Sequence, residues 1–285
     1  MGELARRVLV ALVAAPLAIT MVYVGELPLA LFLGVVGGVG AWELYRMARH
    51  GGVEALEPLG IILAAAFPLI AHADRLMVLR SPAALGGVVF VALLGVSIWA
   101  RGTGGRPLES VAVTVFGALY AGAMLAFGYS LRHHRFVIDP AAGTALVMFP
   151  VILTWASDIG AYFVGRAFGK AKLIPSISPG KTRAGAVGAI VLTMGIALLY
   201  NSQVLRPWAQ LALAPWTALV FGLLVSVAAQ IGDLAESLLK REAGVKDSSH
   251  LLPGHGGILD RLDSLYFVLP VAYLVLGRLV LAAPQ

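Results

Sequence analysis

Residues 211–263 read LALAPWTALVFGLLVSVAAQIGDLAESLLKREAGVKDSSHLLPGHGGILDRLD and join two unlike segments. The first, as far as Ala235, is almost wholly apolar and long enough to cross a membrane as a helix, which needs about 20 such residues. The second, 237–263, contains four Lys or Arg, four Asp or Glu and two His residues. The apolar part decides the fold, and the charged part raises the question of why so apolar a chain gathers charge at one place.

The whole chain has the composition of a membrane protein. Of its 285 residues, 59% are hydrophobic and 13% are charged, and the mean hydropathy is +0.89. Soluble domains carry about 25% charged residues. We therefore predict an all-α, polytopic integral membrane protein. The chain has no cysteine, which excludes disulfides, thiolate metal sites and cysteine nucleophiles.

Nine apolar segments qualify as membrane-spanning helices. They are residues 8–25, 27–45, 59–79, 83–100, 108–130, 142–164, 184–204, 211–235 and 262–282. The third is the weakest, because Pro68, His72 and Asp74 interrupt it. The first resembles a signal peptide, but another span follows directly, so we interpret it as a transmembrane helix. We divide the chain into N-terminal transmembrane helices, 1–140, and a C-terminal catalytic region, 141–285, that carries two charged loops.

The basic residues indicate how these spans are oriented. With nine spans, 15 of the 21 Lys and Arg residues fall on the side of the N-terminus, and the other 6 fall on the opposite side. Because cytoplasmic loops carry an excess of Lys and Arg, we expect the N-terminus and both charged loops inside and the C-terminus outside. The net charge of +6 has the same explanation, so no nucleic-acid partner is expected.

Five acidic residues lie near the expected cytoplasmic ends of three spans. They are Asp158, Asp233, Glu236, Asp260 and Asp263. The second and third are three residues apart, as are the last two, so each pair shares a helix face. Such carboxylates suit Mg²⁺, which binds a few of them and keeps positions for water and phosphate. The alternative is that each acid pairs with a Lys or Arg or caps a helix. The residues expected to hold metal are Asp158, Asp233, Glu236 and Asp260.

The loop SISPGKTRAG, residues 176–185, has the chemistry of an anion site. It supplies hydroxyl groups, two cations and backbone N–H groups at the start of a helix. A nucleotide-binding P-loop is excluded, because Pro175 stands where the first glycine of that motif is required. A basic anchor that contacts lipid headgroups is the alternative, and composition alone favours neither. The side chains expected to bind substrate are Ser178, Lys181, Thr182 and Arg183.

A second glycine-rich turn, PGHGGILDR, covers residues 253–261. Its three glycines let the backbone approach a ligand closely. An acid beside an anion site requires a cation between the two charges, which favours a metal-bridged polyphosphate. For the histidine, the alternative is that it only braces the loop. The substrate-binding residues expected here are His255, Gly256, Gly257 and Arg261.

These residues together resemble the signature of the phosphatidate cytidylyltransferase, or CDP-diacylglycerol synthase, family. That signature reads roughly S-x-x-K-R-x(4)-K-D-x(5)-P-G-H-G-G-x-x-D-R-x-D, and every fixed position is filled here. The matching residues are Ser237, Lys240, Arg241, Lys246, Asp247, Pro253, Gly254, His255, Gly256, Gly257, Asp260, Arg261 and Asp263. The recognisable part is roughly 150–285, with WELYRMAR, 42–49, a faint similarity before it. In contrast, Ala184 stands where the family usually has Glu.

The resemblance implies that CMP passes from CTP to phosphatidic acid, giving CDP-diacylglycerol and pyrophosphate in phospholipid biosynthesis. It also implies an Mg²⁺ cofactor with room for a second cation, a homodimer, and a site in the cell (inner) membrane that faces the cytoplasm. In that reaction Asp233 and Asp260 are expected to hold Mg²⁺ on the triphosphate, and Asp158 to bind the second cation. The residues expected to act in catalysis are Asp233, Asp260, Lys240, Arg241, Asp263, Lys246 and Asp247.

Other classes of protein compete with this interpretation. An ion- or proton-coupled transporter also uses intramembrane acids, but here they cluster at one interface, and no internal repeat is evident. A CTP-dependent lipid kinase, or a synthase that uses another lipid phosphate, fits the same loops. A CDP-alcohol phosphotransferase is disfavoured because its D-G-x-x-A-R signature is missing, since Leu-Ala-Glu follows Asp233.

Overall fold

The computed structural model describes residues 3–78, 82–251, 254, 256–279 and 281–282, and these form two compact units. The first unit takes its described residues from Met1–Leu17, Glu26–Tyr129 and Leu239–Arg261. The second takes them from Ala18–Gly25, Ser130–Leu238 and Leu262–Gln285. The segment 239–261 thus packs with the N-terminal helices. The predicted division of the chain into 1–140 and 141–285 does not include this packing. A separate catalytic region, 141–285, stays a prediction.

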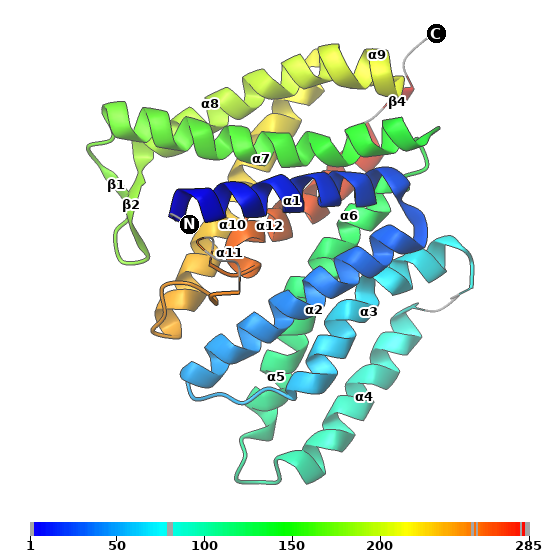
Figure 1. The fold of residues 1–285 in the computed structure, drawn as a ribbon, viewed down its shortest axis with the longest axis vertical. Coiled ribbons are helices and arrows are strands. Elements are labelled where there is room, and N and C mark those ends of the chain that lie inside the picture. Colours follow the sequence, from blue (N-terminus) through cyan, green and yellow to red (C-terminus); the bar gives the residue numbers. More distant parts are fainter. Residues whose placement is uncertain (1–2, 79–81, 252–253, 255, 280, 283–285) are drawn as a thin grey trace. The chain divides into compact units, whose positions relative to one another are not determined.

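Helices that approach closely build the first unit. They are part of α1 (Glu3–Val24), α2 (Glu26–His50), α3 (Glu57–Arg75), α4 (Pro82–Ala100), α5 (Pro107–Gly117), the π-helix η1 (Ala118–Ala123), most of α6 (Met124–Arg132) and the first residues of α11 (Leu259–Leu262). In Figure 1, α2, α3 and α5 lie side by side. A Cβ on Gly34 would lie 2.7 Å from the carbonyl oxygen of Ala65, and one on Gly122 would overlap Ala64. Small residues therefore let these backbones meet, as is typical of membrane helices.

Hydrogen bonds from buried polar groups fix α2 within the first unit. The Tyr45 hydroxyl donates to the carbonyl of Thr114 on α5, over 2.7 Å. The Thr114 hydroxyl in turn accepts from the Leu56 N–H, also over 2.7 Å. Buried polar groups destabilise a fold unless they find partners, so these bonds select one arrangement of α2 against α5.

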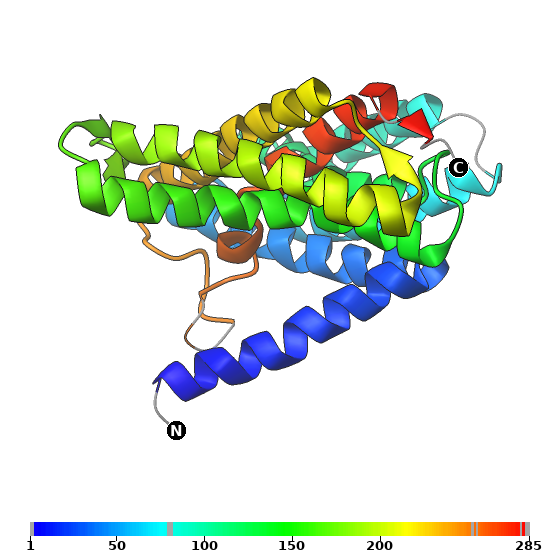
Figure 2. The same cartoon turned by 90° about the horizontal axis from the view of Figure 1, so that it is seen from above.

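The second unit is built around two long antiparallel helices. Its elements are α7 (Pro140–Phe168), β1 (Lys172–Ile174), β2 (Ser178–Thr182), α8 (Arg183–Tyr200), the π-helix η2 (Asn201–Leu205), α9 (Arg206–Ala209), β3 (Leu211–Ala212), most of α10 (Pro215–Glu242), α12 (Leu265–Leu279) and β4 (Leu281–Ala282). Figures 1 and 2 show α7 and α8 side by side along their length. They meet at glycines, since a Cβ on Gly160 would lie 2.7 Å from the Gly188 carbonyl oxygen.

The expected phosphate-binding loop, 176–185, forms the second strand of a short hairpin that begins at Lys172. Strands β1 and β2 are antiparallel, with Lys172 opposite Thr182 and Ile174 opposite Ser178. Thr182 ends the hairpin in an extended conformation and begins α8, because its hydroxyl accepts the Gly185 N–H over 3.1 Å. A threonine cap of this kind sets where the helix starts.

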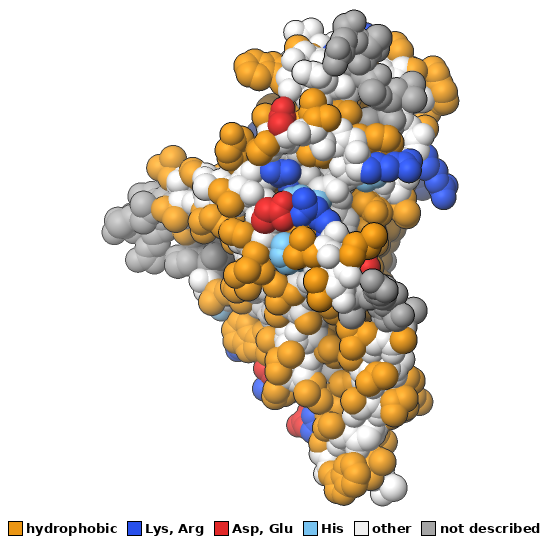
Figure 3. Space-filling model, turned by 90° about the vertical axis from the view of Figure 1, so that its right-hand side faces the viewer, with side chains coloured by type: hydrophobic (Ala, Val, Ile, Leu, Met, Phe, Trp, Pro, Cys, Tyr) orange, Lys and Arg blue, Asp and Glu red, His pale blue; other side chains and the backbone are white. Residues whose placement is uncertain are grey.

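The predicted membrane-spanning character is confirmed. Within the described residues, seven helices are long and apolar enough to cross a membrane: Glu26–His50, Glu57–Arg75, Pro107–Arg132, Pro140–Phe168, Arg183–Ala209, Pro215–Glu242 and Leu259–Leu279. The remaining two predicted segments match the shorter apolar helices Leu12–Val24 and Ala84–Ala100. Large apolar side chains such as Trp99 and Val35 are 84% and 66% exposed. In Figure 3 hydrophobic side chains cover most of the surface in view, as a lipid-facing surface requires.

The contact between α7 and α8 gives a stability prediction. A Cβ on Gly188 would overlap the branched Val164 side chain, whereas one on Gly195 of the same helix meets nothing within 4 Å. Gly188→Ala should therefore lower the free energy of unfolding by about 1–3 kcal/mol through overpacking. Gly195→Ala should be neutral or stabilising, because alanine favours a helix. Thermal unfolding in detergent compares the two variants, and equal midpoints would contradict the close packing.

Candidate active site

A cavity of about 500 Å³ lies in the second unit, lined by residues of α7, the hairpin, α8 and α10. This volume is in the range of small-molecule sites, about 300–1,000 Å³. Two carboxylates and two cations from distant parts of the sequence meet here. The charged residues of its lining are Asp158, Arg166, Lys181 and Asp233.

An ion pair joins two of these residues. The Lys181 Nζ lies 2.6 Å from Asp233 Oδ2, and the two side chains are 26% and 35% exposed. Asp158 interacts electrostatically with both of them and with Asp263. Both side chains line the cavity, and the Lys181 nitrogen itself is buried against Asp233. A polyanionic ligand that displaces this contact would meet a cation and carboxylates at one place.

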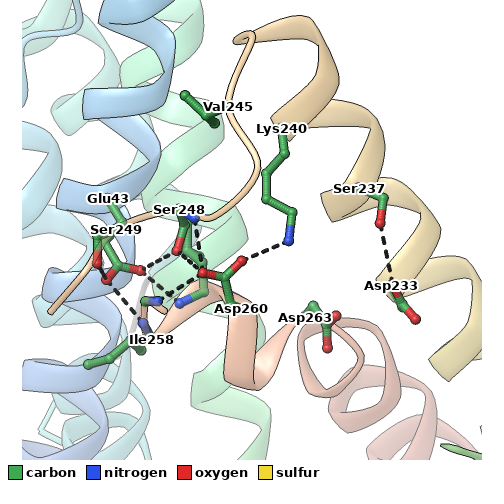
Figure 4. A network of polar contacts seen from close by, with 12 residues as sticks. Glu43, Asp233, Ser237, Lys240, Val245, Ser248, Ser249, Ile258, Asp260 and Asp263 are labelled. Carbon is green, nitrogen blue, oxygen red and sulfur yellow. Dashed lines mark hydrogen bonds and ion pairs between the residues drawn. The ribbon is translucent and has the colours of Figure 1, made fainter. Parts of the chain in front are cut away.

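Local geometry explains how these side chains reach the cavity. Lys181 precedes the Thr182 cap, and the Arg183 N–H donates to the Ala171 carbonyl over 3.0 Å, so both ends of the hairpin are held. Asp233 projects from α10, where the Ser237 hydroxyl donates to its Oδ1 over 3.4 Å (Figure 4). These contacts restrict both members of the ion pair before a ligand arrives.

The residues expected to bind substrate on this hairpin divide into two groups. Lys181 and Thr182 line the cavity, although the Thr182 hydroxyl accepts the Gly185 N–H that caps α8. The other two do not line the cavity as far as the structure describes it. Ser178 is half-buried in β2, and Arg183 is exposed at the start of α8. Lys181 is therefore the cation of this loop that is best placed to contact a ligand.

A second polar network, in the first unit, surrounds Asp260. Its Oδ1 lies 2.7 Å from Lys240 Nζ, and its Oδ2 accepts the N–H groups of Ser248 and Gly257 over 2.9 and 2.8 Å (Figure 4). The Ser248 hydroxyl also donates to Oδ2 over 2.9 Å. The Asp260 side chain is only 5% exposed. The sequence predicted a Mg²⁺ ligand here, with pairing to a Lys or Arg as the alternative, and the structure shows Asp260 paired with Lys240.

The glycines of the turn pack against Asp260, and their expected contact with substrate stays a prediction. The Gly257 N–H, expected to meet a ligand, donates to Asp260. Gly256 has a φ of +80°, which favours glycine, and a Cβ there would lie 2.7 Å from Asp260 Oδ2. His255 lies outside the described residues, and so its expected contact with phosphate stays a prediction.

The four acids expected to hold metal are divided between the units, with Asp260 in the first and Asp158, Asp233 and Glu236 in the second. Their joint role as metal ligands stays a prediction. Among the described residues, no three His, Cys, Asp or Glu side chains are grouped as a metal site. Glu236 is 1% exposed and does not line the cavity, and Asp260 is surrounded by protein donors. Asp158 and Asp233 share the cavity and still fit Mg²⁺, because this ion is commonly held by one or two carboxylates plus substrate phosphates.

The remaining signature residues lie at the end of α10 and after it. Lys240 and Arg241, expected in a loop, lie in the last turn of the helix, which ends before Gly244 with its φ of +69°. Exposed Lys246 and Asp247 line a cavity of about 690 Å³ in the first unit together with residues of α2. Arg261 is exposed at α11.

Asp263 belongs to the second unit. It lies in the turn between α11 and α12, where its Oδ1 accepts the Ser264 N–H over 2.6 Å. It interacts electrostatically with Asp158 of α7.

Sequence reasoning missed one functional candidate, Glu43 on α2. Its side chain is completely buried and accepts hydrogen bonds from four groups of the segment 248–259. The signal in the sequence was an acidic residue within a span, at the second position of WELYRMAR. Nothing in that signal indicated its partners.

The fold and the cavity define a helical membrane protein whose buried charges suit phosphate chemistry. The chain belongs to the cytidylyltransferase family, whose model matches residues 5–279. It is 34% identical over 282 residues to the phosphatidate cytidylyltransferase of Bacillus subtilis (strain 168), covering 97% of this chain and 99% of that protein. The protein of that name from Pseudomonas aeruginosa is 34% identical over 94% of this chain and 95% of its own length. The one from Brucella suis is 33% identical, over 96% and 93%.

The ion pair in the cavity gives a prediction about activity. Lys181→Ala removes the cation that faces Asp233 and should lower cytidylyl transfer by about 100-fold or more, as loss of one well-placed charged donor does. Lys172→Ala is the matched control, because Lys172 is exposed on the same hairpin and does not line the cavity. Initial rates of both purified variants check this, and equal rates would remove Lys181 from the site.

Proposed function

We propose that this protein is a phosphatidate cytidylyltransferase, which transfers CMP from CTP to phosphatidic acid and releases CDP-diacylglycerol and pyrophosphate in phospholipid biosynthesis. Similarity over nearly the whole chain to relatives of that name carries the proposal. The cavity supports it, because both substrates are polyanions that need cations nearby. The apolar helices support it too, since one of these substrates is a lipid.

The proposed reaction is an in-line displacement at phosphorus. An oxygen of the phosphatidate phosphate forms a bond to the α-phosphorus of CTP, and the bond from that phosphorus to the oxygen of pyrophosphate breaks. The attacking oxygen is already anionic, so no strong general base is needed. Catalysis rests on holding the two phosphates together and on neutralising their charge. Lys181 meets the second need from inside the cavity.

A divalent cation is part of the proposal. Asp158 and Asp233 would hold Mg²⁺, with phosphate oxygens and water as its other ligands. When bound, the ion offsets the negative charge of the triphosphate. A second cation beside Asp158, and Glu236 or Asp260 as further ligands, are additional proposals that the same metal titrations would test.

The signature residues around α10 and α11 complete the proposed machinery. Their proposed task is to offset charge on the leaving pyrophosphate and to keep the acids in place. The basic members of this set are Lys240, Arg241, Lys246 and Arg261, and the acidic ones are Asp247, Asp260 and Asp263. Ser178, Thr182 and Arg183 are proposed to contact CTP or the phosphatidate headgroup, with His255, Gly256 and Gly257.

We propose that the site faces the cytoplasm in the cell (inner) membrane. The excess of basic residues on the side of the N-terminus supports this orientation, with the C-terminus outside. A site at that interface lets a soluble nucleotide meet a lipid whose tails stay in the bilayer. A homodimer is proposed from the family resemblance.

A direct assay tests the reaction. Protein in detergent, supplied with phosphatidic acid, Mg²⁺ and labelled CTP, should form CDP-diacylglycerol and pyrophosphate in equal amounts. Product from another lipid phosphate but none from phosphatidic acid would contradict the proposed substrate. Folded protein that forms neither product, and instead moves ions in liposomes, would favour a transporter.

The two acidic sites should differ in their metal dependence. Asp233→Asn removes an accessible carboxylate of the cavity, so half-maximal activity should require at least about tenfold more Mg²⁺. Asp260→Asn removes the buried partner of Lys240 and should lower kcat by about tenfold or more with a smaller shift in the Mg²⁺ requirement. Mg²⁺ titrations measure both effects, with Asp74→Asn, an exposed acid on α3, as the control. A larger shift for Asp260→Asn would make Asp260 the principal metal ligand.

A further inference from the structure

We propose that Glu43, buried in α2, is a positioning residue that holds the segment from Ser248 to Leu259 and, through it, Asp260. The inference rests on the proposed function for its effect on activity. If the proposal holds, catalysis depends on the N-terminal helix α2 as well as on the signature residues. The contact itself does not depend on what the enzyme transfers.

The hydrogen bonds of Glu43 use its whole accepting capacity. Its Oε1 accepts from the Ser249 hydroxyl over 2.6 Å and from the Ile258 N–H over 3.0 Å. Its Oε2 accepts from the Ser248 hydroxyl over 3.1 Å and from the Leu259 N–H over 2.8 Å. Figure 4 shows the carboxylate beside Ser248, Ser249 and Ile258. A carboxylate has about four acceptor positions, so a donor lies at each of them, with the Ser248 hydroxyl shared between Glu43 and Asp260.

Burial makes these bonds mutually dependent. The Glu43 side chain is 0% exposed, and a buried carboxylate is strongly destabilising unless donors surround it. Two of its donors are N–H groups at the start of α11, where a helix leaves such groups without partners of its own. Removing the carboxylate therefore leaves backbone groups of the segment unpaired inside the unit.

The network continues from Glu43 to Asp260. The Ser248 hydroxyl lies 3.1 Å from Glu43 Oε2 and 2.9 Å from Asp260 Oδ2, and its single proton serves one of them at a time. Asp260 directly follows Leu259, whose N–H binds Glu43. The two carboxylates thus hold the segment together, and Asp260 also pairs with Lys240.

The shape of the turn supports the same conclusion. A Cβ on Gly257 would lie 2.5 Å from Glu43 Oε2 and would overlap the Ser248 hydroxyl. Gly257 is therefore required so that the carboxylate can approach the turn, which explains a glycine that the sequence assigned to ligand binding. The hydrogen bonds of Glu43 join residues that are 205 to 216 positions apart in the sequence.

Glu43 acts through other residues and not on substrate. Its side chain is fully buried, and it lines neither the cavity around Lys181 nor the one beside Lys246. The segment that it holds adjoins Lys246 and Asp247 and ends at Asp260, which are signature residues. Because Glu43 places these signature residues, its loss should lower kcat. The amount of folded enzyme should stay unchanged.

The test compares Glu43→Gln, Glu43→Asp and the control Glu54→Gln. Glu54 lies in the same unit and pairs with Arg101 at its surface, where its side chain is 64% exposed. Glu43→Gln keeps one acceptor oxygen but turns an NH₂ group toward N–H donors, and so should lower kcat at least tenfold. Glu43→Asp keeps the charge and should regain part of that loss. Glu54→Gln should match the wild type.

Amide hydrogen exchange measures the contact without any substrate. In Glu43→Gln the peptides that contain Ile258 and Leu259 should exchange at least tenfold faster, while peptides of α7 and α8 keep their wild-type rates. If Glu43→Gln does not fold, Ser249→Ala removes the donor at 2.6 Å and should give the same local change to a smaller degree.

The outcomes separate the possibilities. Wild-type exchange in this segment together with wild-type kcat in Glu43→Gln would overturn the proposal. Faster exchange throughout both units, with activity falling only as the folded fraction falls, would make Glu43 a stabilising residue and also overturn it. If wild-type protein transfers no cytidylyl group, the proposed function fails, but local exchange still decides whether Glu43 holds the segment.

Discussion

A charged group inside a membrane protein needs an opposite charge or several hydrogen-bond donors at short range, and the polar parts of this structure follow from that requirement. Lys181 and Asp233 neutralise each other across the cavity, and Lys240 neutralises Asp260. Among the residues that the structure describes, Glu43 is surrounded by hydrogen-bond donors and pairs with no cation. The Glu43 network joins segments more than 200 residues apart, and the Lys240–Asp260 pair joins residues 20 apart.

The two kinds of solution serve different needs. Asp233 lines the cavity and is 35% exposed, so water reaches its carboxylate. The carboxylates of Glu43 and Asp260, at 0% and 5% exposure, accept hydrogen bonds from the backbone instead. Acids of the same chemistry thus either face a cavity or fix the segment around them.

Sequence alone predicted the spans and the charged signature. Apolar runs such as 142–164 predict helices because lipid leaves the backbone no other partners, and α7 confirms that run. Asp158, Lys181 and Asp233 were chosen for their chemistry, and the structure brings them to one cavity. The partner of Asp260 was not predicted, because the sequence indicated a metal ion where the Lys240 side chain lies. Glu43 was missed since its donors lie over 200 residues away, and the hairpin was missed because its strands are only three and five residues long.

The start of α8 has a consequence for how substrate arrives. Thr182, Gly185 and Ala186 line the cavity, and no acidic side chain occurs in the first turn of the helix. Ala184 stands there in place of the Glu that the family signature usually has, so the positive end of the helix is not offset. Attraction of this kind reaches about 10 Å at 0.1 M salt. The attraction that this helix end exerts on an anion in the cavity therefore weakens as the ionic strength rises.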